Sequence, residues 1–109
     1  MLQGEFPHNV TAMVSIKQKD RGAGHSLSWA DSFHFSGLMD TPTSREVFNA
    51  HQRNILLDRN LFCEFRTDIK KGMRISHGDD IYEVAAVPKD QGGQGEILKI
   101  ALKLVPDGG

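Results

Sequence analysis

Apolar and polar side chains alternate with a period of two residues over much of this chain. In the segment 98–104, the apolar positions are Leu98, Ile100, Leu102 and Leu104. Successive side chains of a β-strand point to opposite faces, so this period predicts strands with one buried face. Similar strand-like runs occupy residues 10–17, 27–36, 55–57, 61–66, 73–76 and 81–87. Because most of these runs are joined by short turns, we expect a mainly β fold, a small antiparallel β-barrel or sandwich.

The first two runs are expected to form a β-hairpin, joined by the polar residues 18–25. In the second run, one apolar face consists of Leu27, Trp29, Phe33 and Phe35, interrupted only by Asp31. Exposed nucleic-acid platforms combine aromatic side chains with Lys or Arg, whereas this strand has serines on its other face. We therefore interpret Trp29, Phe33 and Phe35 as core residues.

Turn signals separate the later runs. Residues 77–80 predict a tight reversal in which Gly78 adopts a positive φ. Residues 58–60 are compatible with either a turn or a bulge. The glycine-rich residues 89–96 predict a flexible hairpin loop, and residues 106–109 are expected to be a flexible tail.

A long connection, residues 37–54, separates the hairpin from the later strands. Connections in compact domains mostly run about 4–6 residues, so eighteen residues are unusual. Thr43 followed by Glu46, with Pro42 just before them, matches a capping box and predicts a short helix over residues 44–52.

The energetics of this connection predict a mobile element. Ordering its eighteen residues costs roughly 18 kcal/mol of backbone entropy at ~1 kcal/mol each. Complete burial of Leu38, Met39, Val47 and Phe48 would return roughly 6–12 kcal/mol. We therefore expect residues 37–54 to be mobile in the isolated protein and to become ordered against a partner or sister copies.

Composition excludes several classes of function. The 109 residues suit one domain, residues 1–109. The formal net charge is −1, so tight binding to a nucleic-acid backbone is not indicated. Cys63 is the only cysteine, so no intrachain disulfide can form. The N-terminal residues lack a secretory-signal pattern and no apolar run approaches the ~20 residues that cross a bilayer, so we expect no membrane contact.

The polar and nucleophilic residues predict neither a catalytic site nor a metal site. The histidines are scattered, at His8, His25, His34, His51 and His77. None has the i, i+4 spacing of a helical zinc site, and one thiol cannot complete a thiolate cluster. Cys63 and His34 could meet across the sheet as nucleophile and base, but a cysteine in the run LFCEF is expected to fill the core. We expect no enzymatic activity, no metal and no cofactor.

Two segments resemble a known family. Residues 69–87 contain a glycine turn, a short strand, a second turn and then Tyr82-Glu83-Val84, and residues 96–104 follow a glycine-rich loop as a closing amphipathic strand. Together with the N-terminal hairpin, the long central connection and the total length, this arrangement resembles the head completion proteins, or stoppers, of the head-to-tail connector of long-tailed bacteriophages (siphophages).

The resemblance implies a structural virion protein without enzymatic activity. It would assemble as a ring of about twelve copies below the portal and its adaptor protein after DNA packaging. Its central loops would close the DNA channel, its far face would receive the tail-end protein, and the loops would move aside for ejection. Double-stranded DNA would pass without sequence-specific contact, and the protein would occupy the host cytoplasm during assembly.

The central connection carries the candidate site. The channel-closing loop is expected to comprise Asp40, Thr41, Pro42, Thr43, Ser44, Arg45, Glu46, Val47, Phe48, Asn49, Ala50 and His51, flanked by the candidate hinges Gly37 and Asn54. Val47 and Phe48 are expected to contact neighbouring copies, and Arg45 and Glu46 to form a charged pair between neighbours. A closed ring would add such weak contacts around its circumference.

Two alternatives remain open. Another connector role, adaptor or tail-terminating, could use a similar barrel. An OB-like nucleic-acid-binding module would instead bind single strands with an affinity that falls with salt.

Overall fold

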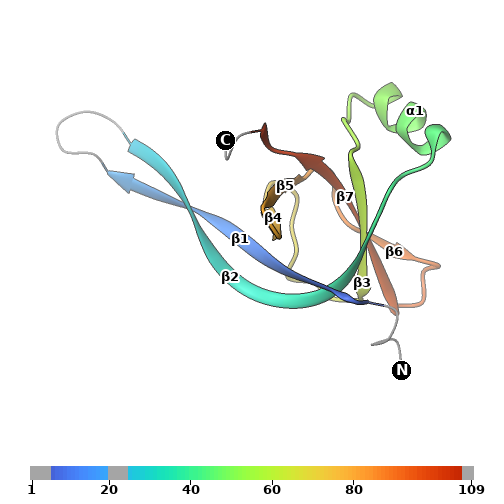
Figure 1. Cartoon of the computed structure of the whole chain (residues 1–109), viewed down its shortest axis with the longest axis horizontal. Coiled ribbons are helices and arrows are strands. Elements are labelled where there is room, and N and C mark those ends of the chain that lie inside the picture. The colour runs from blue at the N-terminus through green and yellow to red at the C-terminus, as the bar shows by residue number, and fades with distance from the viewer. Residues whose placement is uncertain (1–5, 20–24, 107–109) are drawn as a thin grey trace.

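The computed structural model describes residues 6–19 and 25–106. In chain order, the elements are β1 (His8–Lys19), β2 (His25–Asp40), α1 (Ser44–Gln52), β3 (Arg59–Glu64), β4 (Arg74–His77), β5 (Asp80–Val84), β6 (Lys89–Gln91) and β7 (Ile97–Leu104) (Figure 1). The mainly β class, with one short helix among the described residues, is confirmed.

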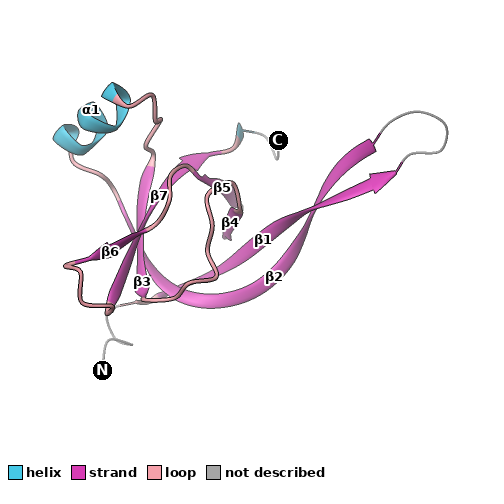
Figure 2. Cartoon of the chain, turned by 180° about the vertical axis from the view of Figure 1, so that it is seen from behind, coloured by secondary structure: helices cyan, strands magenta, loops and turns pink. Residues whose placement is uncertain are grey.

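Antiparallel strand pairing closes on itself. The strands are ordered β3-β2-β1-β4-β5-β7-β6, and an additional pairing of β3 with β7 closes six of the described strands into a ring. The remaining strand, β6, pairs with the first residues of β7. Figure 2 shows this ring from behind, with α1 outside it. The expected barrel-like antiparallel architecture is therefore confirmed.

Apolar side chains fill the interior of the ring. The buried cluster consists of Val10, Ala12, Leu61, Cys63, Ile69, Ile75, Tyr82, Val84, Leu98, Ile100 and Leu102. The predicted apolar face of β7 is confirmed for its first three members, whereas Leu104, at the end of the strand, is 43% exposed. Burial of these side chains is the main apolar contribution to the stability of the ring.

β1 and β2 form the predicted hairpin, whose paired residues run from His8–Gly37 to Lys19–His25. β1 also pairs with β4, but only through residues 11–13. In the described part of the chain, residues 14–19 and 25–30 therefore form a two-stranded ribbon that projects away from the ring (Figure 1). Residues 20–24 of the predicted connection lie outside the described residues.

A bulge in β2 changes which side chains reach the core. One extra residue, Ser32, interrupts the pairing of β2 with β1, and an extra residue reverses the faces on which later side chains lie. Phe33 and Phe35 pack against the buried cluster. Trp29 lies on the opposite face, with the guanidinium carbon of Arg74 4.3 Å from its ring centroid. The prediction that Trp29 is a core residue was wrong.

Only some of the predictions for the later turns are confirmed. Gly78 has φ 60° in the β4–β5 turn, as predicted. Residues 89–96 are not a flexible loop throughout, because residues 89–91 form β6 and the Asp90 carboxylate accepts the Gly95 N–H at 3.0 Å. The predicted strand at residues 55–57 is irregular instead, since this segment carries the chain from the end of α1 back to β3. Of the open alternatives for residues 58–60, neither a turn nor a bulge forms, because β3 already begins at Arg59.

Candidate functional site

The long connection between the hairpin and the later strands occupies residues 41–58, not 37–54. Residues 37–40 extend β2 and pair with β3. Gly37 is buried in this strand, where it pairs with His8 on one side and Cys63 on the other. A Cβ atom at Gly37 would lie 2.7 Å from Leu61 Cδ1. The close approach of β2 and β3 therefore explains the glycine, and the role of Gly37 as a hinge remains a prediction.

The predicted helix is confirmed with the predicted bounds, and its first turn has the predicted capping box. The Glu46 N–H donates to Thr43 Oγ1 at 3.1 Å, and the Thr43 N–H donates to Glu46 Oε1 at 2.9 Å. Two backbone groups that a helix start leaves without partners are thus satisfied within the segment itself.

The helix ends in a motif built around Asn54, which has φ 61°. The Asn54 N–H donates to the His51 carbonyl and the Ile55 N–H donates to the Ala50 carbonyl, both at 2.9 Å. This is the Schellman arrangement, with asparagine at the left-handed position usually taken by glycine. Asn54 therefore terminates α1, and its role as a hinge remains a prediction.

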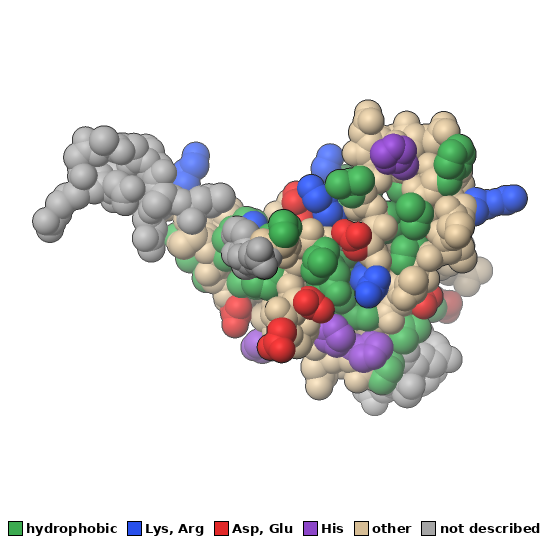
Figure 3. All heavy atoms as spheres, turned by 45° about the horizontal axis from the view of Figure 1, so that its top comes forward, with side chains coloured by type: hydrophobic (Ala, Val, Ile, Leu, Met, Phe, Trp, Pro, Cys, Tyr) green, Lys and Arg blue, Asp and Glu red, His purple; other side chains and the backbone are tan. Residues whose placement is uncertain are grey.

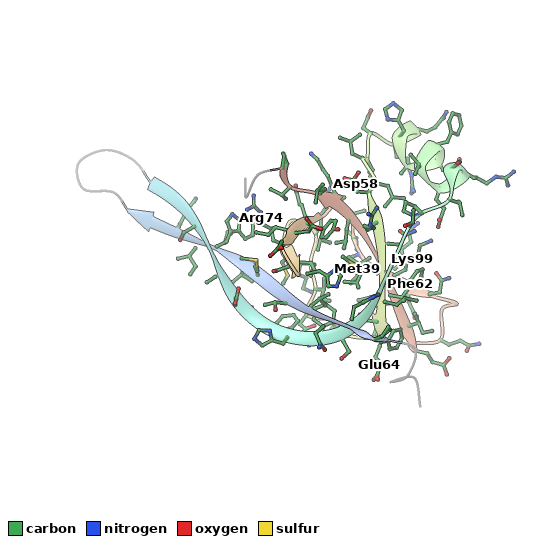
Figure 4. The ribbon with its side chains drawn as sticks, viewed as in Figure 1. Met39, Asp58, Phe62, Glu64, Arg74 and Lys99 are labelled. Atoms are coloured by element: carbon green, nitrogen blue, oxygen red, sulfur yellow. The ribbon has the colours of Figure 1, made fainter. Side chains whose placement is uncertain are left out.

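Glu46 also connects α1 to the barrel. Lys99 Nζ of β7 lies 2.7 Å from Glu46 Oε2, and Asn60 Nδ2 of β3 donates to Glu46 Oε1 at 3.4 Å. The hydrogen bond from Lys99, followed by that from the Thr43 backbone, lowers the pKa of Glu46. Figure 4 shows Lys99 beside Phe62, and its Nζ lies 5.8 Å from the centroid of that ring.

The charged partner of Glu46 is thus in the same chain. In the single chain the carboxylate pairs with Lys99, and the expected pair with Arg45 of a neighbouring copy remains a prediction. These two residues are 53 positions apart and meet only because β7 lies beside β3. No local spacing rule could have found this contact.

The helix leaves its larger apolar residues exposed. Val47 is 40% exposed and Phe48 is 62% exposed. A groove beside them is also lined by Leu56, Leu57 and Leu104. Figure 3 shows apolar side chains reaching the surface in separate patches, with basic and acidic side chains interspersed. This exposure is what a contact between copies requires, and that contact remains a prediction.

Asp58 fixes the far end of the connection. Its N–H donates to the Leu102 carbonyl at 2.8 Å, and its Oδ2 accepts the Leu104 N–H at 2.7 Å. Asp58 lies at the same end of the barrel as α1 in Figure 4. The connection is therefore attached to β7 at two places, through Glu46 and through Asp58.

Cys63 and His34 do not form a nucleophile–base pair. Cys63 is 1% exposed in the core, where burial raises the pKa of its thiol to about 11. His34 is exposed, and its Nδ1 lies 2.8 Å from Thr11 Oγ1. The interpretation of Cys63 as a core residue is confirmed.

Two histidines do meet, which the sequence did not indicate. The rings of His8 and His77 are 5.1 Å apart between centroids, and His8 Nδ1 accepts the Met39 N–H at 3.0 Å. In the neutral ring, acceptance at Nδ1 places the imidazole proton on Nε2. Within residues 6–19 and 25–106, no group of three or more His, Cys, Asp or Glu side chains is arranged to hold a metal ion, and no helix there is long and apolar enough to span a membrane.

The closed antiparallel ring with one long helical connection defines a small structural barrel protein. Its sequence matches the family of phage head completion proteins over residues 1–104, so the chain belongs to that family. It is 25% identical over 96 residues to the head completion protein gp16 of Bacillus phage SPP1. The aligned residues cover 88% of each protein. The predicted family is confirmed, and the protein is a structural head completion protein of the virion. This family is not a known enzyme family.

A solved structure shows the same fold. The solution structure of protein SF1141 from Shigella flexneri 2a has a TM-score of 0.78 to this chain and covers 98% of it and 99% of its own length. The two sequences are 16% identical. This likeness supports the barrel architecture alone.

Proposed function

We propose that this protein forms a ring at the head-to-tail connector and closes the DNA channel with residues 40–58, which include the candidate loop Asp40–His51. The ring lies below the portal and its adaptor, receives the tail-end protein on its far face and reopens for ejection. Before assembly the protein is in the host cytoplasm. One observation carries the proposal: α1 is stabilised at both ends by its own hydrogen bonds, yet it leaves Val47 and Phe48 exposed.

Burial of the exposed side chains contributes more free energy to a closed ring than to a contact between two free chains. Burying the exposed part of Phe48, 62% of its surface, contributes about 1–2 kcal/mol per copy. Around a ring of about twelve copies this sums to roughly 12–24 kcal/mol, because each contact forms at high effective concentration once its neighbours are in place. A contact too weak to join two free chains can therefore hold a closed ring.

The charge distribution supports a channel that lets DNA pass. The net charge is −1, and the surface in Figure 3 mixes both signs. Phosphate binding grows with the number of Lys and Arg contacts, so a mixed surface holds DNA weakly. Such a lining closes the channel by blocking it and does not oppose ejection by binding the genome.

Deletion of the helix tests the proposal. The ring of strand pairings includes no residue of α1, so replacing residues 43–52 by a short Gly-Ser linker should leave a folded barrel. Heads completed with this variant should lose DNA to nuclease, while heads completed with Asn49→Ser, a change at another exposed helix position, should protect it. Full protection of the genome by the deletion variant would contradict channel closure.

A single engineered cysteine tests the contact between copies. Cys63 is buried and its thiol pKa is about 11, so a cysteine introduced by Phe48→Cys is the one that reacts. A short bismaleimide should cross-link this variant in assembled connectors and leave the free protein as monomer. If the connectors do not cross-link and electron microscopy places α1 on the outside of an open ring, an adaptor or tail-terminating role replaces the proposed one.

A further inference from the structure

We propose that Glu46 is a latch that holds α1 against the barrel in the free protein and that opening its contact with Lys99 releases the connection to reach sister copies. This inference rests on the proposed function, because it concerns how the same segment is regulated. Glu46 is thus a positioning residue for α1, acting through a polar contact that can be broken and remade.

Four contacts converge on one carboxylate. Glu46 accepts hydrogen bonds from the Thr43 N–H, the Thr43 hydroxyl and the Asn60 amide, and it pairs with Lys99. The first two belong to the helix, and the last two belong to β3 and β7. The same side chain therefore both starts the helix and ties it to the barrel wall.

Little apolar packing supports the same interface. All of α1 lies within the described residues, and Ala50 is its one buried residue. A hollow of about 180 Å³ remains between helix and barrel, lined in part by Ala50, Asn60, Lys99 and Ala101. Because apolar side chains do not fill this hollow, the polar contacts of Glu46 contribute a large share of the docking.

Loss of the latch would have a large effect on the helix. A helix of nine residues is marginal in water when nothing packs against it. Undocked residues 44–52 would therefore melt or re-form against another surface. The Glu46 and Lys99 side chains are 33% and 28% exposed, so salt can screen their attraction. Release is thus expected to respond to ionic strength and to a competing charge from a neighbouring copy.

Amide hydrogen exchange on the free, full-length protein tests the latch. Lys99→Met keeps the aliphatic stem over Phe62 and the capping box of Glu46 but removes the charge. We expect the amides of residues 47–52 to exchange about three- to tenfold faster in this variant, the range for losing a partly exposed, charge-assisted hydrogen bond. Lys103→Met is the matched control, since it removes the same charge from the same outward face of β7, and it should leave these rates unchanged.

Two further measurements separate a latch from general destabilisation. In 1 M NaCl, where the Debye length is about 3 Å, wild-type exchange in α1 should approach that of Lys99→Met, while the variant should change little. Ala101→Val narrows the hollow and suits a strand, so it should slow exchange in α1 when added to Lys99→Met. Amides of β3 and β7 serve as internal references and should keep their rates in all variants.

The outcomes also distinguish this inference from channel closure. If Lys99→Met leaves exchange in α1 unchanged, or accelerates β3 and β7 equally, the latch is wrong whatever the DNA-retention assay shows. If α1 exchange rises as expected, the latch is supported even where heads completed without α1 retain their genome. Heads completed with Lys99→Met should protect DNA, because the latch acts before the ring closes.

Discussion

Replacing Gly37 with alanine should destabilise the barrel by about 1–2 kcal/mol. The new Cβ atom would lie 2.7 Å from Leu61 Cδ1 and 2.9 Å from the Phe62 carbonyl oxygen. Leu61 is fully buried and the carbonyl belongs to the backbone of β3, so neither can move without disturbing the core. Overpacking of this kind costs roughly 1–3 kcal/mol, partly offset by about 0.4–1 kcal/mol because alanine restricts the unfolded chain.

Thermal unfolding followed by circular dichroism measures this effect. For a domain of this size the melting temperature should fall by roughly 4–16 °C. Ser36→Ala, at the exposed neighbouring position, is the control and should melt with the wild type. Leu61→Val removes part of the conflict and should recover some of the loss in the double variant. A Gly37→Ala protein as stable as wild type would refute the argument from close approach.

Three other perturbations have defined outcomes. The hydrogen bond from Lys99 lowers the pKa of Glu46 from its usual 4.5, so the stabilisation from this pair is complete above that value and is lost as pH falls through the lower folded-state pKa. The protection of the α1 amides, corrected for the intrinsic pH dependence of exchange, should therefore fall in acid, and Glu46→Gln should remove that step. Burial raises the pKa of Cys63 from 9.0 to about 11, which lowers the fraction of thiolate at pH 8 about a hundredfold. A disulfide reagent should therefore react at least about a hundredfold more slowly with the native protein than with urea-unfolded protein. Asn54→Ala should destabilise α1 by about 1 kcal/mol because Asn54 has φ 61°, whereas Asn54→Gly should be neutral or slightly stabilising, as measured by amide exchange.

The sequence predicted those elements whose signals are local. The alternation in β7 identified its buried residues, and Thr43 with Glu46 identified the start of α1, because capping depends on residues three positions apart. The bulge at Ser32 could not be predicted from local signals. A bulge depends on the pairing of two strands, so the alternation of β2 alone placed Trp29 on the wrong face.

Within the candidate site, the position of the helix was predictable and its contacts with the barrel were not. The helix and its exposed Val47 and Phe48 followed from the pattern of residues 44–52. The partner of Glu46 did not, because Lys99 reaches it only after the ring of strands has closed. The meeting of His8 with His77 depends in the same way on the pairing of β1 with β4.

The structure gives the proposed channel closure a different physical basis from the one that the sequence suggested. From the sequence, we compared the entropy cost of ordering the connection with the free energy of burying its apolar side chains. In the structure, however, Met39 belongs to β2, and Val47 and Phe48 remain exposed. What orders residues 41–58 is a set of polar contacts at the helix start, at the helix end and at Glu46 and Asp58. Polar groups released from such contacts can bond to water at a net cost of about 0.5–1.5 kcal/mol each, whereas separating a packed apolar interface would expose new surface. A segment held in this way can leave the barrel and join a ring with small free-energy changes at each step, which is what the proposed closure of a channel and its opening for ejection would require.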